Sequence, residues 1–122
     1  KRAVKLAVSA PFHSPMMRPA ADVMAQALAE AEIKAPRFPV IANVTARPVT
    51  DPAEIRKLLV EQVTGSVRWR ESMLFAVENG VDAIVEAGSG KVLTGMAKRI
   101  SPDLKGIALN TPQDIEDFLK TL

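Results

Sequence analysis

The sequence contains no cysteine and only one histidine, His13. The lack of cysteine excludes disulfides and thiolate chemistry, and a single histidine cannot assemble a Cys/His zinc site within the chain. Four Phe and one Trp are too few for the aromatic platforms on which single-stranded nucleic acids stack. These absences argue against a metal site and against a nucleic-acid partner.

Long apolar runs are also missing. No segment approaches the ~20 apolar residues that span a bilayer, and no signal-peptide pattern opens the chain. The 122 residues are 48% hydrophobic and 25% charged, with a formal net charge of +2. This composition is typical of a folded globular protein, and we expect a cytoplasmic one with no membrane partner.

The first residues predict a strand that needs a partner. Val4, Leu6 and Val8 alternate with smaller or polar residues, as in a half-buried strand. The chain opens without Met and runs directly into this alternation. We therefore expect a fragment of a longer polypeptide.

Helices and strands alternate along the rest of the chain, which predicts an α/β fold with a largely parallel sheet. Pro19 places the start of the first helix nearby, and Asp51, Pro52 and Glu54 are typical of a capped helix start. The predicted helices cover residues 16–35, 52–64, 67–78 (after a cap at Ser66), 91–100 and 112–122, and the predicted strands cover 38–43, 82–87 and 104–109.

Several side chains have structural interpretations. Ser66 is expected to cap the third helix, Gly65 to end the second, and Trp69 to pack in the core. The methionines lie at helical spacing and are interpreted as core filler. These are Met16, Met17, Met24, Met73 and Met96.

His13 is the clearest candidate for chemistry. It lies in a loop between the predicted first strand and first helix, and histidine is the side chain whose ordinary pKa, about 6.5, lies nearest neutrality. A general base would fit this position, and so would an ordinary surface or capping histidine. No serine has the Gly-x-Ser-x-Gly pattern of a hydrolase nucleophile, so the partner of a catalytic His13 must lie elsewhere.

The loop Gly88-Ser89-Gly90-Lys91 is the second candidate. It departs from a phosphate-binding loop, because Val85 stands at the first glycine position and Val92 follows the lysine. A tight strand-to-helix turn is the favoured interpretation, and nucleotide binding is the weaker alternative.

Four segments, in order and spanning nearly the whole chain, resemble the family of malonyl-CoA:acyl carrier protein transacylases and the related acyltransferase domains of polyketide synthases. The segments are Ala10-Pro11-Phe12-His13 leading into Met16-Met17-Arg18-Pro19-Ala20, then Val40-Ile41-Ala42-Asn43-Val44-Thr45, then Glu61-Gln62 leading into Val67-Arg68-Trp69, and Glu86-Ala87-Gly88-Ser89-Gly90-Lys91-Val92-Leu93-Thr94-Gly95.

The resemblance implies a fold and roles for three residues. The fold would be the C-terminal part of an α/β-hydrolase-like acyltransferase core (residues 9–122), preceded by the last strand of a small ferredoxin-like subdomain (residues 1–8). His13 would be the catalytic base, and the main-chain carbonyl of Gln62 would accept a hydrogen bond from its ring. Phe12 would line the acyl site, where a Phe goes with malonyl and a Ser with methyl-branched units.

The resemblance also implies partners and an activity. The intact enzyme would move malonyl from coenzyme A, a thioester substrate rather than a cofactor, to the pantetheine thiol of acyl carrier protein in fatty acid biosynthesis. The nucleophile elbow, the carboxylate-binding arginine and the oxyanion-hole loop would come from the missing N-terminal part, so the isolated chain should be inactive. Lys91, Lys98 and Arg99 are candidates for steering the acidic carrier protein. A noncatalytic α/β binding module and a polyketide synthase acyltransferase domain are the alternatives.

Overall fold

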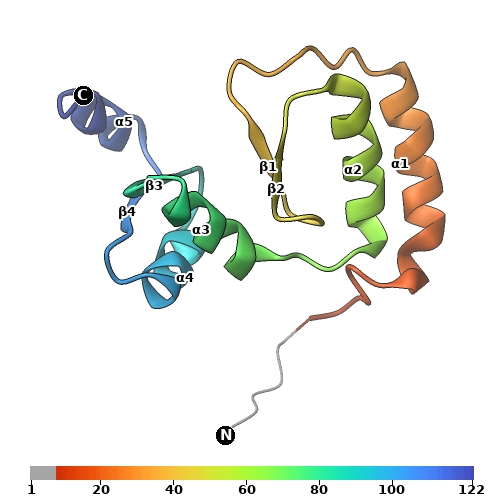
Figure 1. The fold of residues 1–122 in the computed structure, drawn as a ribbon, viewed down its shortest axis with the longest axis horizontal. Helices are drawn as coiled ribbons and strands as arrows, with labels where there is room; N and C mark the ends of the chain where they lie inside the picture. The colour runs from red at the N-terminus through yellow and green to blue at the C-terminus, as the bar shows by residue number, and fades with distance from the viewer. Residues whose placement is uncertain (1–7) are drawn as a thin grey trace, which may run out of the picture. The chain divides into compact units, whose positions relative to one another are not determined.

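The computed structural model describes residues 8–122, and this part of the chain divides into two compact units. One unit ends at Arg68, and the other comprises Trp69–Leu122 (Figure 1). Helices alternate with strands, which confirms the α/β class. The predicted first strand, residues 3–8, lies almost wholly outside the described residues, as does the subdomain assigned to it. The elements of the first unit are a 3-10 helix, η1 (Pro15–Met17), α1 (Arg18–Glu30), β1 (Val40–Ala42), β2 (Arg47–Val49) and α2 (Pro52–Thr64).

Helices α1 and α2 pack side by side in the first unit (Figure 1). Pro19 lies in the first turn of α1, as expected. The helix ends at Glu30, five residues before the predicted end at residue 35. Its last carbonyls are held by Arg56 of α2, whose Nε donates to Leu28 O at 2.6 Å and whose Nη2 donates to Ala31 O at 2.9 Å. Arg56 therefore caps α1 and joins the two helices.

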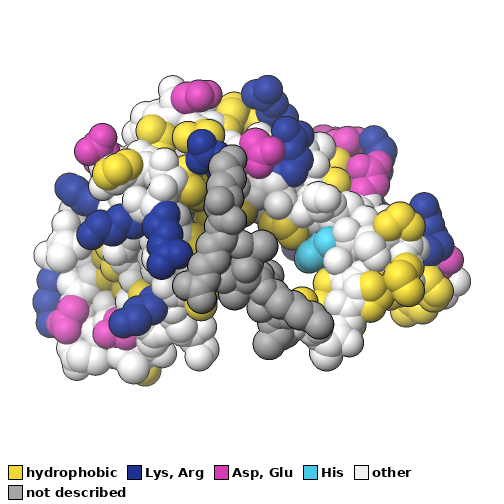
Figure 2. Space-filling model, turned by 90° about the horizontal axis from the view of Figure 1, so that it is seen from below, with side chains coloured by type: hydrophobic (Ala, Val, Ile, Leu, Met, Phe, Trp, Pro, Cys, Tyr) yellow, Lys and Arg dark blue, Asp and Glu magenta, His cyan; other side chains and the backbone are white. Residues whose placement is uncertain are grey.

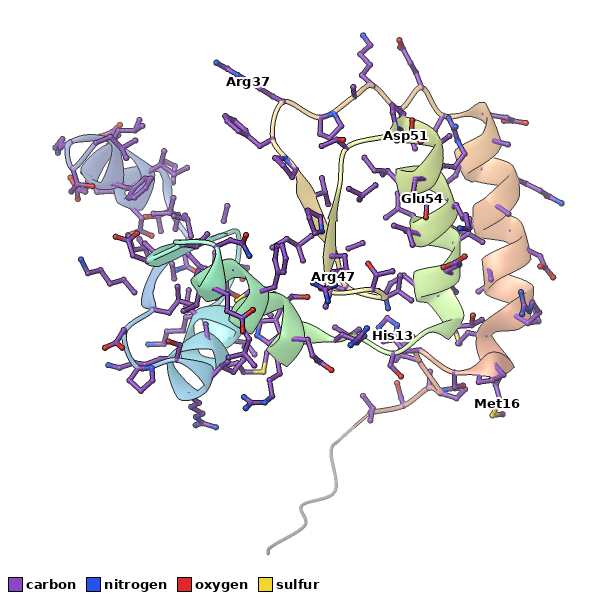
Figure 3. The ribbon with its side chains drawn as sticks, viewed as in Figure 1. His13, Met16, Arg37, Arg47, Asp51 and Glu54 are labelled. Carbon is purple, nitrogen blue, oxygen red and sulfur yellow. The ribbon has the colours of Figure 1, made fainter. Side chains whose placement is uncertain are left out.

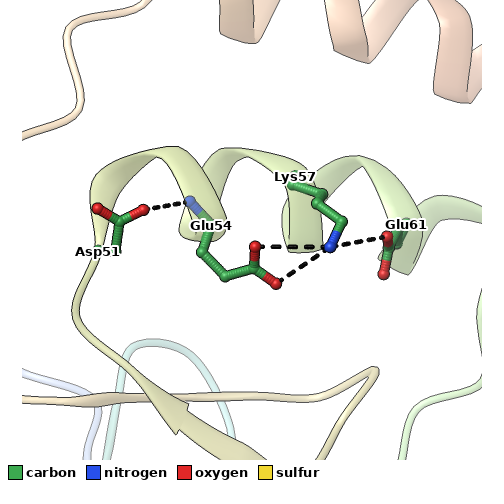
Figure 4. A network of polar contacts seen from close by, with 4 residues as sticks. All are labelled: Asp51, Glu54, Lys57 and Glu61. Atoms are coloured by element: carbon green, nitrogen blue, oxygen red, sulfur yellow. Dashed lines mark hydrogen bonds and ion pairs between the residues drawn. The ribbon is translucent and has the colours of Figure 1, made fainter.

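Helix α2 has the predicted bounds, and the signal at its start is local. The carboxylate of Asp51 accepts the amide of Glu54 at 2.8 Å, which satisfies one of the free N–H groups of the first turn. Lys57 then pairs with Glu54 and Glu61 on the exposed face of the helix (Figure 4). Such exposed pairs add little stability compared with the cap.

Gly65 ends α2, but for a reason other than the expected one. Its backbone is extended, at φ −92° and ψ 152°, rather than left-handed. A Cβ at this position would lie 2.8 Å from Val44 Cγ2 and 3.0 Å from Glu61 O. Glycine is therefore needed here for close approach between the end of the helix and the neighbouring loop.

A short antiparallel hairpin, β1–β2, replaces the single strand expected over residues 38–43. The prediction missed β2, which has Pro48 at its centre and is only three residues long. The turn contains Ala46 at φ 55° rather than the Asn-Gly or Asp-Gly pair that makes a hairpin recognisable in a sequence.

The second unit contains a parallel pair of strands, in keeping with the largely parallel sheet expected from the sequence. Its elements are α3 (Trp69–Glu78), β3 (Ala83–Ala87), α4 (Val92–Ile100), β4 (Lys105–Leu109) and α5 (Pro112–Leu119). Strands β3 and β4 are parallel and are joined through α4, and α3 and α4 pack together (Figure 1). Met73, Ala97 and Leu104 form the buried cluster of this unit, with Trp69 packed against it as expected.

Three other expectations were wrong. Helix α3 begins at Trp69, so Arg68 and not Ser66 precedes its first residue. The last helix ends at Leu119 rather than at residue 122. Of the methionines, Met73 is buried, but Met16 is 75% exposed, and Met24 and Met96 are also exposed. Helical spacing correctly identified an apolar stripe, but within residues 8–122 little packs over those positions.

Candidate active site around His13

The loop before α1 holds His13 in an unusual backbone conformation. Its φ is 57°, in the left-handed region, where histidine is among the few non-glycine residues found with any frequency. Ser14 Oγ donates to Pro11 O at 2.8 Å, and Met17 N donates to Ser14 O at 3.0 Å. The first bond closes a turn that includes the histidine, and the second closes the turn that follows it in η1.

The imidazole of His13 contacts the C-terminal end of α2. The distance between Nδ1 and the carbonyl oxygen of Gln62 is 2.9 Å, across 49 positions of sequence. Figure 3 shows His13 at the opposite end of α2 from Asp51 and Glu54. The last four carbonyls of a helix lack helical donors, so the Gln62 carbonyl is available to the ring.

This hydrogen bond determines which ring nitrogen can act as a base. A carbonyl oxygen only accepts, so Nδ1 must donate, and in the neutral ring Nε2 then carries the lone pair. His13 is exposed, and as the only histidine it is the cyan side chain at the surface in Figure 2. The arrangement matches the orientation of a general base whose second nitrogen is held by an acceptor.

The structure brings two of the three predicted site residues together. The contact between His13 and Gln62 that the resemblance implied is present, while the catalytic role of both residues remains a prediction. Phe12 adjoins His13 in the same loop, and 58% of its surface is exposed. Its role at an acyl site is likewise still a prediction.

The glycine-rich loop of the second unit has a different arrangement. Gly88 and Gly90 adopt φ values of 126° and 107°, and Gly90 N donates to Asn110 Oδ1 at 2.6 Å. Glu86, near the end of β3, accepts Leu93 N at 3.2 Å and Thr94 N at 2.9 Å. The first-turn amides of α4, which would cradle a phosphate, already have a carboxylate partner. This disfavours nucleotide binding and supports the structural-turn interpretation.

Main-chain amides at the starts of α4 and α5 lower the pKa values of two carboxylates. The amide of Thr94 is the main cause that lowers the pKa of Glu86 below its ordinary 4.5, and burial opposes it. The pKa of Asp114 is lowered below 3.8, first by the amide of Asn110 and then by that of Thr111. Asp114 also donates its amide to Thr111 Oγ1 at 3.2 Å, completing a capping box at α5.

The sequence did not reveal Glu86 and Arg56, because each caps a helix to which it does not belong. Glu86 lies on β3 and caps the start of α4, and Arg56 lies on α2 and caps the end of α1. A hint existed for Glu86: α4 follows Lys91, a poor capping residue, so its free amides needed another acceptor. No comparable local hint pointed to Arg56.

Residues 8–122 offer neither a metal site nor a membrane span. No group of three or more His, Asp or Glu side chains within this part could hold a metal ion. Nor does any described helix combine the length and apolar character required to cross a membrane.

Comparison with known proteins shows similarity along the entire chain. It is 43% identical over 122 residues to the malonyl CoA-acyl carrier protein transacylase of Bacillus subtilis, covering 100% of this chain and 38% of that protein. The chain therefore spans well under half the length of the curated relatives it matches. No protein-family model matches it.

Solved structures show the same similarity over nearly the whole chain. An acyl-carrier-protein-S-malonyltransferase from Bartonella henselae superposes with a TM-score of 0.91 at 52% identity, covering 99% of this chain and 38% of that one. A malonyl-transacylase solved in complex with a type II PKS acyl-carrier protein gives a TM-score of 0.89 at 41% identity, covering 100% of this chain and 40% of that chain.

Proposed function

Because the chain is homologous over its whole length to a part of the malonyl CoA-acyl carrier protein transacylases, we propose that it is the C-terminal part of such an acyltransferase and supplies the catalytic base, His13. The observation that carries this proposal is the 2.9 Å contact between His13 Nδ1 and Gln62 O. It gives a lone histidine, in a loop, the tautomer and orientation that nucleophilic acyl transfer requires.

In the first half-reaction, His13 Nε2 takes the proton of a serine hydroxyl supplied by the remainder of the enzyme. The serine oxygen attacks the thioester carbonyl of malonyl-CoA, and main-chain amides outside this chain stabilise the tetrahedral oxyanion. The carbon–sulfur bond then breaks, and coenzyme A leaves with the proton from the imidazolium. Malonyl remains on the serine as an ester.

In the second half-reaction, the same groups act again, with acyl carrier protein as the acceptor of the malonyl group. His13 takes the proton of the pantetheine thiol of acyl carrier protein, and the sulfur attacks the malonyl ester. The serine oxygen leaves and recovers its proton from the imidazolium. Throughout, the Gln62 carbonyl keeps Nδ1 protonated, so that Nε2 alone exchanges protons, as the buried Asp ensures in a hydrolase triad.

The remainder of the enzyme is the first proposed partner. The chain lacks a Gly-x-Ser-x-Gly elbow, so on its own it should be inactive. Large apolar side chains also stand exposed on the described chain, among them Val92 (69%), on α4, and Leu119, on α5. Such faces fit a segment that the rest of a longer protein covers, and they weigh against a self-contained binding module.

The carrier protein and the acyl group complete the proposal. Phe12 beside the base would crowd a methyl branch, which favours malonyl, although apolar pockets discriminate one methyl by only ~1–3 kcal/mol. Fatty acid biosynthesis in the cytoplasm is the proposed setting. A polyketide carrier is the second candidate, because one structural relative is a malonyl-transacylase solved with a type II PKS acyl-carrier protein.

The decisive test is His13→Ala in the intact enzyme that contains this segment. Transfer of malonyl from coenzyme A to acyl carrier protein should fall by at least about 10³-fold, since the base of both half-reactions is lost. Lys34→Ala, at a charged side chain that is 79% exposed beyond the end of α1, is the matched control and should keep wild-type turnover. Near-normal transfer by the His13 variant would refute the assignment.

A further inference from the structure

Gln62 presents two different groups to the same nitrogen of His13. Its main-chain oxygen lies 2.9 Å from Nδ1, and its side-chain Nε2 lies 3.4 Å from that atom. The oxygen requires a proton on Nδ1, whereas Nε2–H can only donate to a lone pair there. The two contacts therefore favour opposite tautomers of the ring, and only the first leaves Nε2 of His13 free to act as a base.

The main-chain contact depends on how α2 ends. Gly65 N donates to Glu61 O at 2.9 Å, which closes the last helical turn. The helical donor for the next carbonyl, that of Gln62, would be the amide of Ser66, but the extended backbone at Gly65 carries the chain out of the helix. The Gln62 carbonyl is thus left for the imidazole.

The side chain of Gln62 stabilises this end of α2. Its Nε2 donates to Gly65 O at 2.9 Å, so one residue bridges the final turn and the first residue beyond it. The second hydrogen of this amide competes only weakly for His13 Nδ1, because the 3.4 Å contact is near the limit of a hydrogen bond. Both effects favour the tautomer with the proton on Nδ1.

The amide has one orientation that achieves this, and it leaves an oxygen unsatisfied. Gln62 Oε1 is buried and has no hydrogen-bond partner in the described structure. Turning the amide over would place Oε1 against the Gly65 carbonyl, two acceptors facing each other. Gln62 also lines a pocket of about 120 Å³ whose other walls come from β1, β2 and α2 and are mostly apolar. A buried amide oxygen in such surroundings is costly, and structural burial alone would be better served by an apolar side chain.

We infer that the side-chain amide of Gln62 is a positioning group: by holding Gly65 O, it shapes the end of α2 so that the Gln62 carbonyl selects the Nδ1–H tautomer of His13. This goes beyond the main-chain contact itself, which any residue at position 62 could provide. The inference rests on the proposed function only in treating His13 as a catalytic base; the effect on the ring is independent of activity.

The test reads the tautomer directly. Since the chain has one histidine, its two imidazole nitrogens give the only such signals in a ¹⁵N spectrum. At pH about 9, well above the ordinary histidine pKa of about 6.5, the nitrogen shifts report the ratio of Nδ1–H to Nε2–H. Gln62→Met, which keeps an unbranched side chain but removes the amide, should lower this ratio about three- to tenfold, the range expected for loss of one hydrogen bond.

Thr64→Val is the matched control. Thr64 Oγ1 donates to Glu61 O at 3.4 Å, so this variant removes another side-chain bond from the end of α2 without touching Gln62 or His13. The tautomer ratio should stay at the wild-type value. An unchanged ratio in Gln62→Met, or an equal fall in Thr64→Val, would overturn the inference, because the amide would then have no special role.

In the intact enzyme, Gln62→Met should lower kcat while leaving KM for malonyl-CoA nearly unchanged, and Thr64→Val should change neither. If His13→Ala retained transfer, the proposed function would fail while the tautomer results still stood.

Discussion

The C-terminal end of α2 and the N-terminal end of α4 differ in what occupies them. At the end of α2, a free carbonyl meets an imidazole that has one nitrogen engaged and the other available. At the start of α4, the carboxylate of Glu86 accepts the amides of Leu93 and Thr94 and the hydroxyl of Thr94, at 3.0 Å. Both ends satisfy groups that a helix leaves unpaired, but only the first leaves a reactive atom free.

A sequence motif alone does not show whether a site is open to a ligand. A glycine-rich loop before a helix has the backbone for anion binding, yet a carboxylate of the chain's own can take the amides that an anion would need. A lone histidine has no glycine-rich loop around it, yet one well-placed acceptor gives it a defined tautomer. The partner of each group, rather than the local pattern, decides whether the site is open.

Gly106→Ala should disrupt the start of α4, where Glu86 accepts the helix amides. Among the proposed variants, it should lower the stability of the fold most. A Cβ at position 106 would lie 2.9 Å from Thr94 Cβ and 3.3 Å from Thr94 Cα, so β4 and α4 would have to separate, carrying Thr94 away from Glu86. The free energy of unfolding should fall by about 1–3 kcal/mol. Urea denaturation monitored by circular dichroism measures it.

Gly95→Ala is the control for that variant within the same helix. Apart from its chain neighbours and the backbone of its own helix, no described atom lies within 4 Å of a Cβ added there, so the substitution should leave stability unchanged or raise it by up to about 1 kcal/mol. If both glycine variants behaved alike, close packing of α4 on β4 would not explain the effect.

Glu86→Gln tests the same start of α4, with a smaller expected loss of stability. The pKa of Glu86 is lowered in the folded state, so its contribution is fully present above the ordinary 4.5 and is lost as pH falls through the folded-state pKa. At pH 7 the variant should melt a few degrees below wild type. This gap should stay constant down to about pH 5 and close in more acidic buffer.

Glu116→Gln, on the exposed side of α5, serves as its control, since a carboxylate without those amide partners should give no gap at any pH. Thermal melts of the three proteins between pH 3 and 7 distinguish the cases. A Glu86 gap that widened toward acid pH would contradict a lowered pKa for this carboxylate in the folded state.

The opposite end of α4 carries the smallest predicted effect. Lys98 and Arg99 lie in its last turn, where cations complement the helix dipole. If they also steer an acidic carrier protein, Lys98→Glu/Arg99→Glu should reduce kcat/KM for acyl carrier protein in the intact enzyme by up to about tenfold at low salt, and by little at 0.5 M salt. A reduction that did not depend on salt would leave these residues with the helix-end role alone.

The sequence predicted those features whose causes are local. Asp51, Pro52 and Glu54 marked the start of α2, and the parallel arrangement of β3 and β4, which a helix joins, agrees with the largely parallel sheet that the alternation of elements predicted. The end of α1 and the existence of β2 could not be predicted in the same way. Arg56 caps α1 from a different helix, and β2 is recognisable only through its pairing with β1.

For the candidate site, the sequence pointed to one histidine, in a loop before a helix, as the only side chain whose ordinary pKa suits base chemistry at neutral pH, and the ordered motifs indicated its family. The hydrogen bond that engages one ring nitrogen, and the closure of the other candidate loop by Glu86, became visible in the folded chain. The reason is physical: hydrogen bonds act over about 3 Å, and packing alone brings positions 13 and 62 within that distance.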